Sequence, residues 1–308
     1  DKLVSPIIPD TSKNSKTLQG EELFLFEEES PKQFLISNYS SPYGKMVFVF
    51  KKPVQSPAFK PVYSSLTEPW FMQEINSGRD TITLWMKQTG IDTLSISVSD
   101  YNMPADTVKV SFVKKAIAKG KGLGEADTKF VMVKANAGSR VNFDYYRLLR
   151  LESSSPLKTA TFDKIIFTEN KDTLKTGFHF TDSIQRIMFV DFKFKEASDY
   201  NLFIPPGTFN DIYGVLNDTI KIHFKTSASK DYGNMLLKLK AGNSIGTLIV
   251  ELVNETDVVT QTKNYKSEEA IKFENITPGN YKLKIVFDSN NNGKWDTGNY
   301  LKKLQPEK

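Results

Sequence analysis

A loop near the C-terminus carries the residue types and the spacing of a calcium site. Residues 288–296 read Asp-Ser-Asn-Asn-Asn-Gly-Lys-Trp-Asp. The positions that supply oxygen ligands in such a loop are Asp288, Asn290, Asn292, Lys294 (through its backbone carbonyl) and Asp296. Alternate residues turn toward the ion, and Gly293 at the sixth position allows the sharp bend that this requires. The spacing is therefore typical of a loop that binds Ca²⁺.

Two features of this loop limit the expected affinity. Position 12 is Asn299, where a strong site has a bidentate glutamate, and only two formal negative charges face the ion. We therefore expect a dissociation constant of about 10⁻⁴–10⁻³ M if calcium binds at all. In the alternative interpretation, the same Asn, Asp and Gly residues form a tight hairpin held by side-chain-to-backbone hydrogen bonds. Weak Ca²⁺ binding is the only cofactor interaction that the sequence suggests.

Few residues remain for nucleophilic or general-base catalysis. The chain has no cysteine, which excludes thiol nucleophiles, disulfides and thiolate metal sites, and it has only two histidines. His179 and His223 each stand between apolar residues, so an alternating strand places both rings on its solvent face. Glu28 and Glu29 are a carboxylate pair, but in an acidic surface stretch that favours solubility. We expect a protein that is not an enzyme.

Two tryptophans are the candidates for ligand binding. Trp70 precedes a predicted strand, and Trp85 lies on the face opposite Ile82, Leu84 and Met86. An exposed indole at either position offers a flat platform for a sugar or another partner. Alternatively, both faces of the strand are buried, and the indole of Trp85 packs between sheets or modules.

These candidates lie in a chain whose main pattern is period-two alternation. Leu94, Ile96 and Val98 alternate with serines, so one face of this strand is apolar and the other polar. The same pattern recurs along the chain between turn residues, without a sustained helical period. The fold class predicted is all-β, built of tandem antiparallel β-sandwich modules.

Changes in composition divide the 308 residues into three modules. The predicted modules are residues 1–116, 117–232 and 233–308. The first boundary falls in a lysine- and glycine-rich stretch that begins at Lys114 and ends at Gly124, a composition typical of a flexible linker.

Short motifs in the second and third modules resemble known bacterial families. They are Ser154-Ser155-Pro156-Leu157, Tyr200-Asn201-Leu202-Phe203-Ile204, Asp211-Ile212-Tyr213-Gly214 and Phe224-Lys225-Thr226, then Ile276-Thr277-Pro278-Gly279-Asn280-Tyr281-Lys282-Leu283. In this order they resemble a bacterial surface-layer Ig-like domain followed by a transthyretin-like, carboxypeptidase regulatory-type domain. The chain as a whole is similar to Ig-like-domain lipoproteins of Bacteroidetes. The resemblance implies Ig-like and transthyretin-like sandwiches, export, and a lipid anchor at the outer membrane.

Charge and hydropathy agree with such a location. The net charge of +5 is too small for a nucleic-acid surface, and no apolar run is long enough for a transmembrane helix. No signal peptide follows Asp1, so we expect the lipid-bearing cysteine to lie upstream of it. The predicted location is the periplasm or the outer-membrane surface.

The function predicted is that of a non-enzymatic, exported cell-envelope protein. It is a structural or protein-interaction component at the outer membrane, and its partners are other envelope proteins, including an outer-membrane protein complex. The alternative is a surface module that binds glycans through exposed aromatic residues.

Overall fold

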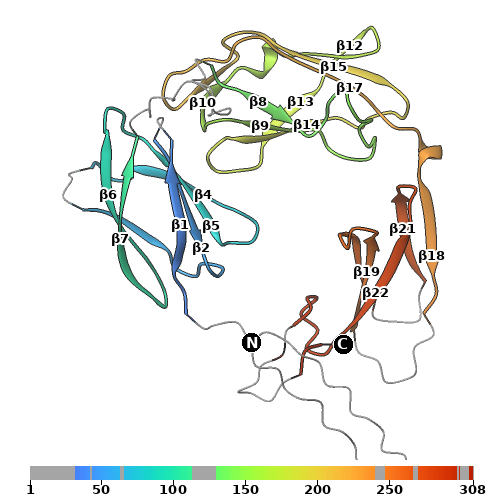
Figure 1. Ribbon diagram of the computed structural model, residues 1–308. Helices are drawn as coiled ribbons and strands as arrows, with labels where there is room; N and C mark the ends of the chain where they lie inside the picture. Colours follow the sequence, from blue (N-terminus) through green and yellow to red (C-terminus); the bar gives the residue numbers. More distant parts are fainter. Residues whose placement is uncertain are drawn as a thin grey trace, which may run out of the picture. The chain divides into compact units, whose positions relative to one another are not determined.

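The protein is all-β, as the alternation predicts. The computed structural model describes residues 32–41, 44–62, 66–112, 130–239, 247–265, 270–296, 298 and 305–307. Within these ranges the helical elements are two short 3₁₀ turns, η1 (Phe162–Lys164) and η2 (Ser229–Asp231), and none is long and apolar enough to cross a membrane. The strands pair antiparallel in several sheets (Figure 1). The prediction of tandem antiparallel β-sandwiches is confirmed.

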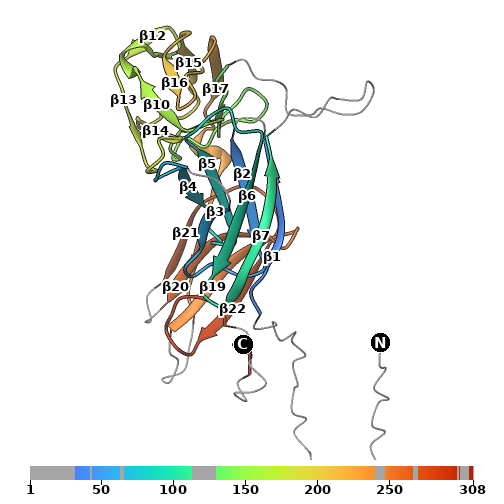
Figure 2. The ribbon, with the colours of Figure 1, turned by 90° about the vertical axis from the view of Figure 1, so that its left-hand side faces the viewer.

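The first sandwich comprises the described residues from 32 to 112. Its four-stranded sheet has the order β1 (Leu35–Ser40), β2 (Lys45–Phe50), β5 (Thr81–Met86) and β4 (Phe71–Ile75). Its three-stranded sheet has the order β3 (Ala58–Val62), β6 (Thr93–Asp100) and β7 (Met103–Ser111), and Figure 2 shows β6 and β7 running side by side. Leu94, Ile96 and Val98 are buried, as predicted, while the residues between them are partly exposed. Phe48 and Phe59, from the two sheets, pack with ring centroids 5.0 Å apart in the shared core.

The second sandwich comprises residues 130–232. One sheet has the order β13 (Gly177–Phe180), β14 (Ile187–Asp191), β9 (Arg150–Ser153) and β8 (Val133–Ala135). The other has the order β12 (Asp172–Leu174), β11 (Ile166–Glu169), β15 (Asp199–Ile204) and β17 (Ile220–Lys225), and β10 (Leu157–Ala160) pairs with β16 (Phe209–Asp211). Its core is rich in aromatic residues, with Phe143, Phe194 and Phe224 buried against one another.

The C-terminal strands begin at Gly233, directly after the second sandwich. β20 (Val259–Tyr265), β19 (Thr247–Asn254) and β22 (Tyr281–Asp288) form a three-stranded sheet in that order, and β18 (Gly233–Leu237) pairs with β21 (Ile271–Ile276). The central strand β19 is buried along most of its length. The candidate calcium loop begins where β22 ends, at Asp288.

The described residues fall into two compact units. Residues 32–234 with 274–278 form one, and the described residues of 235–273 and 279–307 form the other. Both sandwiches thus belong to one unit. The predicted boundaries of three modules, 1–116, 117–232 and 233–308, stay a prediction. The proposed linker and the acidic pair Glu28 and Glu29 lie outside the described residues.

Candidate functional site

Side-chain oxygens of the candidate calcium loop accept hydrogen bonds from the backbone N–H groups of the same loop. Asp288 is buried, and its carboxylate accepts the N–H groups of Asn292 and Gly293 at 3.0 and 2.8 Å. Asn290 Oδ1 also accepts the N–H of Asn292, and Asn292 Oδ1 accepts the N–H of Lys294. Asn291 and Gly293 have positive φ angles of 59° and 74°, the left-handed region that suits Asn and Gly. These are the bonds that the hairpin interpretation expects.

Two further carboxylates, those of Asp296 and Glu307, accept hydrogen bonds from this loop. Asn290 and Asn292 both donate an amide N–H to Asp296 Oδ2, at 2.6 and 2.7 Å. Glu307 accepts the N–H and the hydroxyl of Ser289 through Oε1 and the N–H of Asp296 through Oε2. Glu307 was missed by sequence reasoning because it lies outside the repeat of alternate loop ligands. Among the described residues no group of three or more His, Asp or Glu side chains is placed to hold a metal, and calcium binding at Asp288, Asn290, Asn292, Lys294 and Asp296 stays a prediction.

The tryptophans are buried, so the prediction of an exposed indole platform is wrong. Trp70 is 1% exposed and Trp85 is 2% exposed. Trp70 packs edge-on against Phe71, with ring centroids 4.6 Å apart. Over the ring of Trp85 lie two cations, Lys45 Nζ at 5.4 Å and the guanidinium carbon of Arg186 at 5.8 Å from its centroid. Since Arg186 belongs to the second sandwich, the alternative of packing between modules is correct for Trp85.

Arg186 forms an ionic junction between the two sandwiches. It binds Glu74 of β4 through two hydrogen bonds, from Nε at 3.1 Å and from Nη2 at 2.8 Å. The same guanidinium pairs with Glu152 of β9 at 2.7 Å and donates to the carbonyl of Ser153 at 2.8 Å. We use the name ionic junction for Glu74, Trp85, Glu152 and Arg186. It joins strands of both sandwiches within one unit.

The charges of the ionic junction are strongly coupled. The side chain of Arg186 is 14% exposed, and those of Glu74 and Glu152 are 25% and 30% exposed. Burial opposes ionisation of Glu152, but the charges and hydrogen bonds of Arg186 and then of Arg150, which pairs with Glu152 at 2.8 Å, outweigh it and lower the pKa of this carboxyl. Burial likewise disfavours the charged form of Arg186, yet Glu74 and Glu152 raise its pKa. Glu152 and Arg186 are therefore both ionised at neutral pH.

Tyr213 and Gly44 extend this contact. A Cβ on Gly44 would lie 3.2 Å from Cβ of Met86 and 3.3 Å from the phenol oxygen of Tyr213, and its φ is +76°. The hydroxyl of Tyr213 is buried and has no hydrogen-bond partner among the described residues. Burial, and then the charge of Asp211, raise the pKa of Tyr213. Glycine at position 44 thus allows both the turn and the close approach of the second sandwich.

The histidines lie on solvent faces, as predicted. His179 Nδ1 pairs with Asp191 at 2.6 Å, and His223 Nε2 pairs with Asp199 at 3.0 Å. Their side chains are 50% and 51% exposed. His179 is on β13 and His223 on β17, which belong to different sheets, so the two rings do not share a site.

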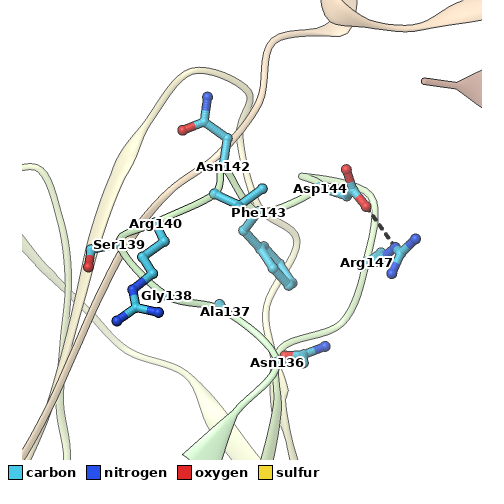
Figure 3. A pocket seen from close by; sticks show the side chains of 10 residues that line it. Asn136, Ala137, Gly138, Ser139, Arg140, Asn142, Phe143, Asp144 and Arg147 are labelled. Carbon is cyan, nitrogen blue, oxygen red and sulfur yellow. Dashed lines mark ion pairs between the residues drawn. The ribbon is translucent and has the colours of Figure 1, made fainter. Parts of the chain in front are cut away.

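A surface pocket opens in the second sandwich, inside the loop of residues 136–147. Its volume is about 540 Å³, and its wall combines apolar surface with charged and amide side chains. Figure 3 shows Phe143 pointing into the middle of the loop, with the Asp144–Arg147 pair at one side. The distance from Arg147 Nε to Asp144 Oδ2 is 2.8 Å. Arg140 and Asn142 also line the pocket and are exposed.

Three tyrosines pack beside this pocket. The ring centroids of Tyr145, Tyr146 and Tyr232 lie 5.4 to 6.1 Å apart, with the rings close to perpendicular. The hydroxyl of Tyr232 donates to Asp144 Oδ1, which links the tyrosines to the pocket wall. Burial, and then the hydrogen bond to Asp144, raise the pKa of Tyr232 to about 12. We use the name tyrosine surface for Tyr145, Tyr146 and Tyr232 together with the loop of residues 136–147.

The core of the second sandwich holds the tyrosine surface in place. Phe143 is buried with its ring 5.4 Å from Phe194 and 5.3 Å from Phe224. Its backbone N–H donates to Lys225 O, and its carbonyl accepts the N–H of Ser227. Sequence reasoning missed this surface because Tyr232 lies 88 residues beyond Asp144. The adjacent pair Tyr145-Tyr146 was the one local signal.

Comparison with known proteins gives no family for the chain. No model of a known protein family matches it, and no curated protein matches its sequence. Among solved structures, SGBP-B of the Bacteroides ovatus mixed-linkage glucan utilization locus, in complex with a mixed-linkage heptasaccharide, is 10% identical, with a TM-score of 0.27. That match covers 78% of this chain and 64% of the other, so the chain spans less than two thirds of that protein.

Two further structures have similar values. The MG0-NIE-MG1 portion of native alpha-2-macroglobulin from Escherichia coli is 10% identical, with a TM-score of 0.26, over 84% of this chain and 97% of that one. The complex of Dpr2 Ig1-Ig2 with DIP-Theta Ig1-Ig3 is 7% identical, with a TM-score of 0.21, over 64% and 100%. Likenesses at this level carry no argument about function.

Proposed function

We propose that the chain is a non-enzymatic, exported cell-envelope protein that acts as a structural or protein-interaction component at the outer membrane. The ordered motifs that resemble Ig-like-domain lipoproteins of Bacteroidetes support export and a lipid anchor. The separation of His179 from His223, and the pairing of each with an exposed aspartate, support a role without catalysis.

The ionic junction is the observation that carries this proposal. A tandem of sandwiches joined by a flexible contact presents its two surfaces independently. Here a guanidinium that is mostly buried binds two carboxylates and a carbonyl from both sandwiches. Such a contact fixes the orientation of one sandwich against the other, which is what a spacer or a two-part docking surface needs.

Crosslinking of the native protein in its source membrane tests the proposal. The wild-type chain, Arg186→Ala and the control Lys193→Ala, an exposed lysine of the second sandwich, are each captured after crosslinking. We expect the same envelope proteins with wild type and control, and a severalfold lower yield with Arg186→Ala. Recovery of the native protein in the cytosolic fraction, or capture that Arg186→Ala leaves unchanged, contradicts the proposal.

The lipid anchor and the calcium site are separate proposals. Mass spectrometry of the detergent-extracted native protein tests the anchor, since an acylated N-terminal cysteine adds the mass of its chains. For calcium, we expect at most a small rise in melting temperature at millimolar Ca²⁺, absent in Asp296→Asn. No rise in the wild-type protein removes the metal and leaves a hairpin held by its own polar groups.

A further inference from the structure

The tyrosine surface has a flat apolar element that faces solvent. Tyr146 is 41% exposed, while Tyr145 and Tyr232 meet it edge-on at interplanar angles of 87° and 74°. Two perpendicular neighbours restrict the ring of Tyr146 to one orientation before any ligand arrives. A restrained aromatic ring costs little side-chain entropy on binding.

Next to this ring stand polar groups whose geometry is also set in advance. Asp144 is held by Tyr232 at one oxygen and by Nε of Arg147 at the other. Arg147 uses Nε for this contact and also interacts with the Tyr146 side chain, and because its side chain is 63% exposed it still presents N–H donors to solvent. Arg140 and Asn142 add donors and an acceptor from the opposite part of the same loop.

The size and the composition of the pocket define the class of ligand. A volume of about 540 Å³ suits a small ligand or two to three rings of a larger one. A phosphate site is disfavoured because Asp144 contributes a negative charge to the wall. A purely apolar ligand is disfavoured because it would leave the charged groups of Arg140, Asp144 and Arg147 without partners, and the mixed wall suits a ligand with both an apolar face and polar edges. A pyranose ring presents an apolar C–H face that packs on an aromatic ring and hydroxyls at its edge that bond to planar Asp, Asn and Arg groups.

We propose that the tyrosine surface binds a saccharide, with one sugar ring packed on Tyr146 and its hydroxyls bonded in the adjacent pocket by Arg147, Asp144 and Arg140. This site is distinct from Trp70 and Trp85, and it does not depend on the structural role proposed above. Tyr146 provides the packing surface, and the Asp144–Arg147 pair provides the fixed donors and acceptors.

A glycan array of neutral and uronic-acid oligosaccharides, followed by calorimetry with the best-bound oligosaccharide, tests the proposal. The variants are Tyr146→Ala and, as a matched control, Tyr101→Ala, which removes another exposed tyrosine, 71% exposed in the first sandwich. We expect Tyr146→Ala to weaken binding about tenfold or more, and Tyr101→Ala to leave it unchanged. Thermal melts check that both variants stay folded, which the exposure of both rings favours.

A second variant tests the polar half of the site. Arg140→Gln removes a charge from the pocket wall without touching the tyrosines, so we expect weaker binding with an unchanged melting temperature. The proposal is overturned if no oligosaccharide of the array binds at millimolar concentration, or if binding survives Tyr146→Ala. It is also overturned if Tyr146→Ala abolishes capture of a crosslinked protein while glycan binding is absent, since the surface is then a protein interface.

Discussion

The ionic junction and the tyrosine surface contain the same three kinds of side chain, but the aromatic ring is buried in the first and exposed in the second. The ionic junction combines an arginine, acids and an aromatic ring in Arg186, Glu74, Glu152 and Trp85, and its indole is 2% exposed. The tyrosine surface combines Arg147, Asp144 and Tyr146, and the ring of Tyr146 is 41% exposed. Residue type therefore does not distinguish a structural contact from a binding surface. What distinguishes them is which part of the chain covers the ring.

Arg186 and Arg147 differ in their exposure and in the number of groups that they bind. Arg186 is 14% exposed and binds two carboxylates and a backbone carbonyl. Arg147 is 63% exposed and is paired with one carboxylate, three residues earlier in the same loop. Removing Arg186 takes the shared cation away from two acids, of which Glu152 keeps its pair with Arg150, whereas removing Arg147 takes the cation away from one acid.

Arg186→Ala is expected to have the largest effect on stability. It removes the cation that the partly buried Glu74 and Glu152 share, although Glu152 keeps its pair with Arg150, and this lowers the free energy of unfolding by about 2–4 kcal/mol. Arg147→Ala, the matched control, is expected to cost less than about 1 kcal/mol. Urea denaturation of the two variants measures both values. Equal losses would mean that the ionic junction is no more buried in solution than a surface ion pair.

Gly44→Ala is expected to have the next largest effect, because it combines backbone strain with a steric conflict. Gly44 and Gly90 both have positive φ, +76° and +83°, so alanine is strained at either position by about 1 kcal/mol. A Cβ at Gly44 also meets Met86 and Tyr213, whereas a Cβ at Gly90 meets no atom of the described residues within 4 Å. We expect Gly44→Ala to cost about 1 kcal/mol more than Gly90→Ala in the same denaturation assay. No difference would mean that the sandwiches separate there at little cost.

The pH dependence of stability tests the tyrosine surface, the second of the two regions compared. The pKa of Tyr232 is raised to about 12 in the folded chain, while an unfolded tyrosine titrates near about 10. Between these values the folded state holds a proton that the unfolded state has lost, so the free energy of unfolding falls as the pH rises. Tyr232→Phe is expected to reduce this fall. Denaturation at several pH values from about 9 to about 11 measures the slope, and equal slopes for wild type and Tyr232→Phe would contradict the raised pKa of Tyr232, which follows from burial and the bond to Asp144.

The alternation of apolar and polar residues predicted which side chains of a strand face the core, but it did not predict contacts between residues far apart in the sequence. It correctly placed Leu94, Ile96 and Val98 in the core and His179 and His223 on solvent faces, because a strand's period of two decides both. It also placed Trp85 opposite its apolar neighbours, but a strand pattern does not say whether another module covers that second face. Arg186 of the second sandwich lies over the ring of Trp85, and its partner Glu74 is 112 residues away in the sequence. The tyrosine surface was missed for the same reason, since Tyr232 reaches Asp144 across a similar distance in sequence.

Tyr213→Phe is expected to have the smallest effect, and it separates the ionic contribution to the junction from the contribution of packing. The hydroxyl of Tyr213 is buried and has no partner in the part of the chain that the structure describes, so its removal is expected to leave the free energy of unfolding unchanged or to raise it by up to about 1 kcal/mol. Tyr200→Phe is the matched control, because the hydroxyl of Tyr200 donates to Glu169 and accepts the N–H of Lys195, and its loss is expected to cost about 1–2 kcal/mol. If Tyr213→Phe costs as much as Tyr200→Phe, the phenol has a partner at the junction, and the closeness of the two sandwiches depends on that hydrogen bond as well as on Arg186.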